Sequence, residues 1–203
     1  MKLIGMLDSP YVRRVAISAQ HLGIALEHDS VSVFRHFEQF QQINPVVKAP
    51  TLVLDDGEVL MDSTLIIDYL EALAGPSKSL MPSDLKQRAR SLRVIGLALA
   101  ACEKSVQLYY ERNLRPADIQ YQPWVERVEG QLAAAFTALE QELEQNGLPT
   151  DGTLTQAGIS LAVAWSFTDL VVPDQIDTRR YPHIAQYTAY AETLEAFVST
   201  PMN

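Results

Sequence analysis

Residues 2–23, KLIGMLDSPYVRRVAISAQHLG, decide the fold, because they place a short apolar run directly before a helix-start signal. Residues 2–6 are mostly apolar and predict a strand. Ser9 and Pro10 favour a helix start, since Ser is a preferred N-cap and Pro at the first helical position loses no needed hydrogen bond. Gly23 suits the left-handed residue that ends a helix. Between these signals, apolar residues recur at helical spacing at Val12, Val15, Ala16, Ala19 and Leu22.

The pattern keeps alternating between strand and helix up to residue 76. Residues 27–33 alternate in polarity and predict a second strand, and residues 34–43 form a short helix or an irregular segment. Residues 51–54 and 59–61 flank an Asp-Gly turn and predict a hairpin, and a helix capped at Ser63 follows. The order β-α-β-α-β-β-α gives a mixed sheet whose first two strands are parallel.

No strand is predicted beyond Pro76. Apolar residues at helical spacing predict long helices over residues 85–109 and 125–143, and a fourth helix lies near residues 184–197. A helix over residues 156–170 is apolar on most sides and should be the buried centre of this part. The stripe of the first long helix comprises Leu85, Ala89, Leu92, Ile95, Leu99, Cys102, Val106 and Tyr109. We therefore predict one domain over residues 1–76 and an all-helical domain over residues 84–203.

Composition narrows the classes of function. The 203 residues carry 16 basic and 25 acidic side chains, a net charge of −9, which disfavours a nucleic-acid partner because phosphate affinity needs clustered Lys and Arg. The single cysteine, Cys102, excludes an internal disulfide, and no His spacing suggests a metal site. No signal peptide or membrane span is predicted. These features predict a cytoplasmic protein with a small-molecule or protein partner.

Three short motifs fall at the corners of the predicted first domain. They are SPYVRRV at residues 9–15, NPVVKAPTL at residues 44–52, and Asp62-Ser63 at the start of the helix after the hairpin. Each has an ordinary structural interpretation, as a helix N-cap, a turn and a helix start respectively. The corner at Ser9 also offers unpaired backbone N–H groups and the positive end of a helix dipole, which stabilise an anion.

These motifs, in this order and followed by a helical half, resemble the glutathione S-transferase superfamily across nearly the whole chain. The resemblance implies an α/β thioredoxin-like N-terminal domain with a mixed four-stranded sheet, followed by an all-α C-terminal domain. It also implies glutathione as co-substrate without a metal, a hydrophobic electrophile as second substrate, and a role in detoxification. Family members commonly form homodimers that join the first domain of one subunit to the second domain of the other.

The resemblance assigns a role to Ser9. A thioredoxin-like redox enzyme would hold two cysteines at this corner, and Ser9 and Val12 stand in their places, so dithiol exchange is excluded. In the serine-type transferases, the matching hydroxyl donates a hydrogen bond to the glutathione sulfur, and the thiolate attacks the electrophile. The N-cap role of Ser9 stays open beside this one, because one hydroxyl cannot easily fill both roles.

The other two motifs supply the implied glutathione-binding residues. A cis bond before Pro50 would turn the backbone of Ala49 toward the cysteinyl part of glutathione, where an extended peptide pairs like an added strand. Lys48 would meet a carboxylate of the tripeptide. Ser63 would bind the γ-glutamyl carboxylate, and Asp62 its ammonium group.

The second domain is expected to contribute the electrophile pocket. Tyr109 and Tyr110 lie toward the end of the first long helix, where the family builds that pocket. Tyr109 falls on the apolar stripe, so packing is its competing role. One element departs from the family pattern, which opens the buried helix with a Ser/Thr-x-x-Asp capping box. Here Thr155 is kept but Gly158 replaces the acid, a loss on the order of 1 kcal/mol.

The sequence therefore predicts a cytoplasmic glutathione transferase that conjugates an electrophilic small molecule. Two alternatives stay open. One is a glutathione-dependent isomerase, dehalogenase or peroxidase with the same glutathione site. The other is a non-catalytic protein-binding scaffold on the same fold, which would have no need of Ser9, Ala49-Pro50 and Asp62-Ser63.

Overall fold

A computed structural model describes residues 1–202 and divides them into two compact units. The first unit contains residues 1–80 together with residues 194–202, and the second contains residues 81–193. The sequence predicts that the second domain runs from residue 84 to residue 203. In the structure, residues 194–202 instead belong to the first unit.

The first unit is built on a four-stranded sheet in the order β2-β1-β3-β4. The strands are β1 (Lys2–Ile4), β2 (Glu27–Asp29), β3 (Thr51–Val53) and β4 (Val59–Met61). β2 is parallel to β1, whereas β3 is antiparallel to both β1 and β4, so the mixed sheet is confirmed. β2 is shorter than predicted, because the backbone turns when the Val31 N–H bonds to the Asp29 carbonyl at 2.9 Å.

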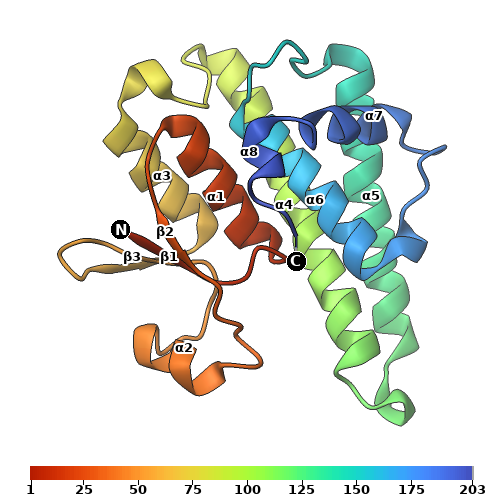
Figure 1. The fold of residues 1–203 in the computed structure, drawn as a ribbon. Coiled ribbons are helices and arrows are strands. Elements are labelled where there is room, and N and C mark those ends of the chain that lie inside the picture. Colours follow the sequence, from red (N-terminus) through yellow and green to blue (C-terminus); the bar gives the residue numbers. More distant parts are fainter. Residues whose placement is uncertain (203) are drawn as a thin grey trace. The chain divides into compact units, whose positions relative to one another are not determined.

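Helices cover both faces of this sheet (Figure 1). α1 (Pro10–Leu22) and α3 (Ser63–Ala74) pack together on one face. On the other face, Ile4 and Val31 contact Phe40 of α2 (Phe37–Ile43), the short helix that the sequence left open. The unit is completed by a 3-10 turn, η1 (Pro76–Lys78), and by α8 (Glu195–Val198), which packs on α1.

The second unit is helical, as predicted. Its helices are α4 (Leu85–Asn113), α5 (Gln122–Asn146), α6 (Gln156–Val171) and α7 (Pro182–Ala191), with 3-10 turns η2 (Ala117–Ile119) and η3 (Pro173–Gln175). α6 is buried on nearly every side and packs against α4 and α7. Trp165 of α6 meets Phe136 of α5 edge to face, with ring centroids 5.4 Å apart. α6 is thus the buried centre that its apolar sequence predicts.

The buried stripe of α4 differs from the predicted one. Leu85 is 81% exposed and Leu92 is also exposed. Ile95 and Cys102 of the predicted stripe are buried, and the other buried side chains are Val94, Ala98, Ala101, Ser105, Leu108 and Glu111. This stripe contains small and hydroxyl side chains, so its apolar signal is weaker than that of the neighbouring stripe. Ser105 Oγ lies 2.8 Å from Thr168 Oγ1 of α6, a contact that apolar spacing does not reveal.

The helix predicted near residues 184–197 is two helices. α7 ends at Ala191, where the Thr193 N–H bonds to the Tyr190 carbonyl at 3.0 Å. Leu194 is extended and caps α8 in the other unit. Neither Pro nor Gly marks this break, so the sequence carries no signal for it.

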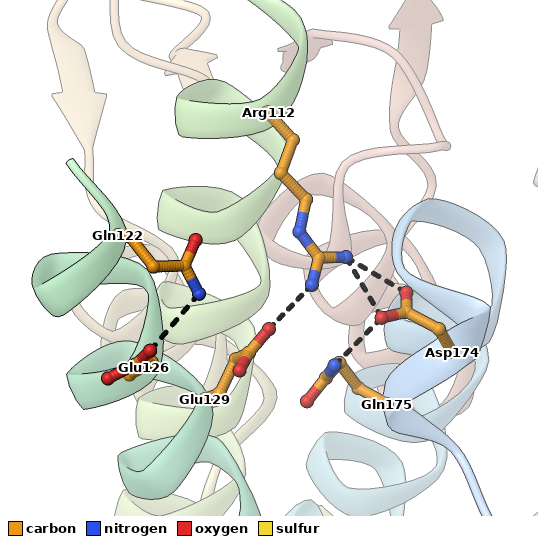
Figure 2. A network of polar contacts seen from close by, with 6 residues as sticks. All are labelled: Arg112, Gln122, Glu126, Glu129, Asp174 and Gln175. Carbon is orange, nitrogen blue, oxygen red and sulfur yellow. Dashed lines mark hydrogen bonds and ion pairs between the residues drawn. The ribbon is translucent and has the colours of Figure 1, made fainter. Parts of the chain in front are cut away.

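Arg112, near the end of α4, ties three elements of the second unit together (Figure 2). Its guanidinium donates to Glu129 Oε1 of α5 at 2.6 Å and to Asp174 Oδ1 of η3 at 2.9 Å. Gln175 Nε2 donates to the other oxygen of Asp174 at 2.8 Å. These bonds hold the segment after α6 against α4 and α5.

Candidate functional site

The register of the sheet brings the three sequence motifs to one end of it. Ile4 pairs with Thr51, and Thr51 pairs with Met61. The end of β1, the beginning of β3 and the end of β4 are therefore neighbours. The corner at Ser9, the loop before Thr51 and the start of α3 all leave the sheet from this end, in the first unit.

A glycine allows the first two motifs to approach closely. Gly5 follows β1 with φ +133°, in the region that favours glycine. A Cβ atom there would lie 2.6 Å from Val12 Cγ2 and 3.1 Å from Ala49 Cβ. The backbone between β1 and α1 thus packs directly against α1 and against Ala49, and a larger residue at position 5 would separate them.

Ser9 is the N-cap residue of α1, but its side chain does not cap the helix. Its backbone is extended, with φ −70° and ψ 123°, and its hydroxyl makes no bond to the amides of the first turn. Within residues 1–202, we find no hydrogen-bond partner for this half-buried hydroxyl. The first turn of α1 also contains no acidic residue to neutralise the helix N-terminus. The corner therefore keeps both a hydroxyl and a positive dipole end for a ligand.

Two charged residues lie beside Ser9. Burial raises the pKa of the Asp8 carboxyl, although the Ser9 backbone and the Arg35 charge partly offset this. The Arg35 guanidinium donates to Met6 Sδ at 3.2 Å, which places this exposed cation at the same corner. An anion held at Ser9 would therefore meet a positive charge from the loop after β2 as well as the helix dipole.

Asn44 and Thr51 brace the second motif. Asn44 Nδ2 donates to Thr51 Oγ1 at 2.9 Å, and the Thr51 hydroxyl donates to the Lys48 carbonyl at 2.8 Å. The peptide bond between Ala49 and Pro50 is cis, as the resemblance implies. Asn44 therefore acts as more than a turn residue: it fixes the loop that presents Lys48 and Ala49.

The third motif begins α3, with a different cap from the one predicted. Asp62, not Ser63, is the N-cap, because Asp62 Oδ1 accepts the Thr64 N–H at 2.9 Å. Asp62 Oδ2 also lies 3.7 Å from Lys48 Nζ, so two predicted ligand-binding residues contact each other. Both side chains remain substantially exposed, and such an exposed pair contributes little stability. Ligand charges can replace it at small cost.

Ser63 is buried beside Arg14, which is not among the predicted site residues. Its hydroxyl accepts a hydrogen bond from Arg14 Nη1 of α1 at 3.0 Å. The same nitrogen donates to Thr64 Oγ1 at 3.1 Å. Arg14 lies within SPYVRRV, but no feature of a single sequence says that an arginine on an apolar helix face points to a serine 49 positions later.

Tyr109 and Tyr110 lie in the second unit, on α4. Their ring centroids are 6.3 Å apart, and both side chains are partly exposed. Burial, and then the neighbouring Tyr109, raise the pKa of Tyr110. The packing role weighed for Tyr109 is filled instead by the preceding residue, Leu108, which is buried.

The arrangement in the first unit suits an anionic peptide-like ligand. It combines a helix N-terminus, two cationic side chains, hydroxyl groups and an exposed acid that can meet an ammonium group. No cluster of three or more His, Cys, Asp and Glu side chains that could hold a metal ion occurs in residues 1–202. In the same part of the chain, no helix is both long and apolar enough to cross a bilayer.

Comparisons with known proteins identify the family. Two family models match, "Glutathione S-transferase, N-terminal domain" over residues 3–78 and "Glutathione S-transferase, C-terminal domain" over residues 122–189. The chain is 28% identical over 202 residues to the uncharacterized GST-like protein YibF of Escherichia coli (strain K12), covering 98% of each protein. It is 30% identical over 204 residues to glutathione S-transferase theta-2 of Rattus norvegicus, covering 98% of this chain and 82% of that one.

A solved structure extends the comparison to three dimensions. A glutathione transferase family member from Pseudomonas fluorescens Pf-5, crystallised with bound glutathione, matches with a TM-score of 0.87 and 28% identity. The match covers 100% of this chain and 98% of that one. The likeness therefore includes both units.

Proposed function

The chain belongs to the glutathione S-transferase superfamily, and we propose that it conjugates glutathione, through its sulfur, to an electrophilic small molecule. In this reaction the glutathione thiol gives its proton to water, and the thiolate attacks an electrophilic carbon. A sulfur–carbon bond forms, and the leaving group departs with its electron pair. The protein's part is to hold the tripeptide and to favour the thiolate.

The observation that carries the proposal is the uncapped hydroxyl of Ser9. A serine at a helix N-terminus ordinarily accepts from the first turn, and this one does not. Because the hydroxyl is not engaged with the first turn, it can rotate to donate its proton to a thiolate beside it. The positive end of the α1 dipole adds to this stabilisation, since a helix N-terminus lowers the pKa of a thiol. Ser9 is thus the proposed catalytic residue.

Glutathione is proposed to lie along the same end of the sheet. The Ala49 backbone before Pro50 would pair with its cysteinyl part, and Lys48 would meet a carboxylate. Ser63 would bind the γ-glutamyl carboxylate and Asp62 the ammonium group. A net charge of −9 opposes an anionic ligand at long range, so these local groups must supply the attraction.

The second substrate is proposed to be a hydrophobic electrophile that contacts Tyr109 and Tyr110.

We further propose a cytoplasmic homodimer with a role in detoxification. Exposed apolar side chains on β4 and α3 support the dimer, because a water-exposed apolar face of this kind is typical of an interface. They are Val59, Met61, Leu65, Tyr69 and Leu73. Sedimentation equilibrium reports the oligomeric state directly.

The decisive experiment replaces Ser9 by Ala. Loss of a hydrogen bond to a charged group costs about 1.5–3 kcal/mol, so we expect turnover to fall about 10- to 100-fold. The pKa of the bound thiol should rise toward about 8.5, its value in free cysteine. The ultraviolet absorbance of the thiolate, followed against pH in the enzyme–glutathione complex, measures this shift.

Two controls make the Ser9 result specific. Ser9→Thr keeps a hydroxyl and should retain most of the thiolate, and glutathione affinity should change little in either variant. Unchanged turnover in Ser9→Ala would remove Ser9 from the mechanism. If the wild-type protein does not bind glutathione, the scaffold alternative replaces the transferase. If it binds glutathione but conjugates no electrophile, isomerase, dehalogenase and peroxidase substrates are tested next on the same site.

A further inference from the structure

Arg14 is a charged residue in the interior of the first unit. The residue is 2% exposed, and a guanidinium in such a position is stabilised by those N–H groups that find acceptors. Nη1 finds two of them at the start of α3, Ser63 Oγ at 3.0 Å and Thr64 Oγ1 at 3.1 Å. The side chain therefore links the helix that begins after Ser9 to the helix that begins after Asp62.

This contact fixes the role that each hydroxyl can play. A serine or threonine hydroxyl has one proton and two acceptor positions. Because Ser63 Oγ and Thr64 Oγ1 both accept from a guanidinium, which has no acceptor of its own, the proton of each hydroxyl must point elsewhere. The structure thus presents two O–H donors, side by side, at the N-terminus of a 12-residue helix.

The positive charge strengthens these donors. A hydroxyl that accepts from a cation is polarised, and its own O–H becomes a better donor. The effect should be larger at Ser63, which is buried in a low dielectric, than at Thr64, which is exposed. The charge also adds to the positive end of the α3 dipole. A ligand carboxylate would therefore meet two aligned donors with a buried cation behind them.

We propose that Arg14 is a positioning residue that orients Ser63 and Thr64 as donors to the γ-glutamyl α-carboxylate of glutathione. The proposal rests on the proposed function, since it concerns how the same site binds the γ-glutamyl end of the tripeptide. Arg14 does not touch the ligand in this scheme and acts through the two hydroxyls. Thr64, which is not among the predicted site residues, becomes a second binding residue.

The test compares three ligands by calorimetry: glutathione, its analogue with the γ-glutamyl α-carboxylate converted to the carboxamide, and its analogue with the glycyl carboxylate converted to the carboxamide. In wild type, the first analogue should bind more weakly than glutathione. Arg14→Lys keeps a buried cation but loses the paired geometry, and Arg14→Met removes the charge. We expect glutathione to bind about 10- to 50-fold more weakly to Arg14→Met and the first analogue to change less than about 3-fold.

The adjacent residue supplies a matched control. Arg13 is equally buried, but its Nε donates to the Thr200 carbonyl at 2.8 Å, away from α3. Arg13→Lys should lower stability without changing the ratio of affinities among the three ligands. The glycyl analogue should follow glutathione in every Arg14 variant, because its altered group is at the other end of the tripeptide.

A double-mutant cycle completes the design. In a Ser63→Ala/Thr64→Val background, Arg14→Lys should have no further effect on glutathione affinity, because the hydroxyls through which it acts are gone. If both Arg14 variants fail to fold, the test is made on the Ser63→Ala/Thr64→Val protein. The proposal would be overturned if this protein still preferred glutathione over the α-carboxamide analogue as strongly as wild type does. So would Arg14 variants that weaken all three ligands equally. A wild-type protein that binds no glutathione would instead refute the proposed function.

Discussion

Gly158 occupies a position where no larger side chain fits. A Cβ atom there would lie 2.0 Å from the Tyr187 hydroxyl oxygen and 2.9 Å from the ring carbon that carries it. The Tyr187 ring is buried, and its hydroxyl has no hydrogen-bond partner within residues 1–202. Burial, and then the charge of Tyr190, raise the pKa of Tyr187, so the group stays neutral. Tyr187 therefore fills the space that a capping carboxylate would need.

We predict that Gly158→Ala destabilises the protein even though alanine is the better helix former. Overpacking against a rigid ring costs about 1–3 kcal/mol. Gly130→Ala, in the exposed middle of α5 with nothing near the added methyl group, should instead stabilise by about 0.5–1 kcal/mol. Urea unfolding of both variants measures the two effects, and equal stabilisation by both would contradict the close contact. Tyr187→Phe should restore only part of the loss, because the ring carbon at 2.9 Å remains.

Individual residues of both units show what a sequence can and cannot reveal. Ser9, Ala49-Pro50 and Asp62-Ser63 are recognisable because each lies at a corner with a strong local signal. Thr155 still caps α6, accepting the Gly158 N–H at 3.1 Å, so half of the capping box survives as its sequence suggests. Arg14 and Tyr187 carry no local signal, because their partners are 49 and 29 positions away.

At the scale of elements, a buried carboxylate joins α4 and α5. Glu142 of α5 accepts hydrogen bonds from Arg90 and Arg93 of α4, and Asn146 Nδ2 donates to it at 2.9 Å. Burial raises the pKa of Glu142, but the two arginines and Asn146 together outweigh burial and hold it below its ordinary value of 4.5. The charged form is therefore favoured in the folded state.

This shift predicts an acid-dependent contribution to stability. A carboxyl group whose pKa is lowered by folding stabilises the protein fully above its unfolded pKa and loses that effect as the pH falls through the folded value. Glu142→Gln should therefore lower the free energy of unfolding by about 1–2 kcal/mol at neutral pH. The loss is no larger because both arginines are partly exposed, and solvent weakens their attraction to the carboxylate. The difference from wild type should shrink below about pH 4.

Chemical unfolding at several pH values checks the Glu142 prediction. Glu103→Gln is the matched control, because this α4 carboxylate is 57% exposed beside Lys104, and such an exposed ion pair contributes less than about 1 kcal/mol. A Glu142→Gln deficit that is constant with pH would mean that packing, not charge, is responsible.

Periodicity recovered the long helices, but not the phase of α4 or every helix end. α5 and α6 follow their apolar spacing closely, because bulky side chains define their buried faces. α4 does not, because Ala98, Ala101 and Ser105 form a close-packing stripe that competes with larger apolar residues next to it. Helix phase is decided by how near the neighbouring helix lies, which the sequence of one helix does not contain.

At the scale of the whole chain, the two ends of the sequence build one unit. Arg13 of α1 donates to the Thr200 carbonyl, and its guanidinium lies 5.3 Å from the centre of the Phe197 ring. Phe197 is 1% exposed. The first 80 residues therefore do not contain all of their own core, and a boundary placed by periodicity near Pro76 cannot show this.

The contact between α1 and Phe197 can be tested by substitution. Phe197→Ala should destabilise the first unit by about 3–4 kcal/mol, because it empties a buried aromatic site and removes the ring beside Arg13. Hydrogen exchange at the α1 amides measures this locally. Val198, one residue later, is 63% exposed. Val198→Ala should change the opening free energy that hydrogen exchange reports for the α1 amides by less than about 0.5 kcal/mol. If the two variants behave alike, α8 is not part of the core of the first unit. If only Phe197→Ala speeds exchange in α1, the corner that begins at Ser9 depends on a segment almost 190 residues away, and residues 1–80 alone should not hold it.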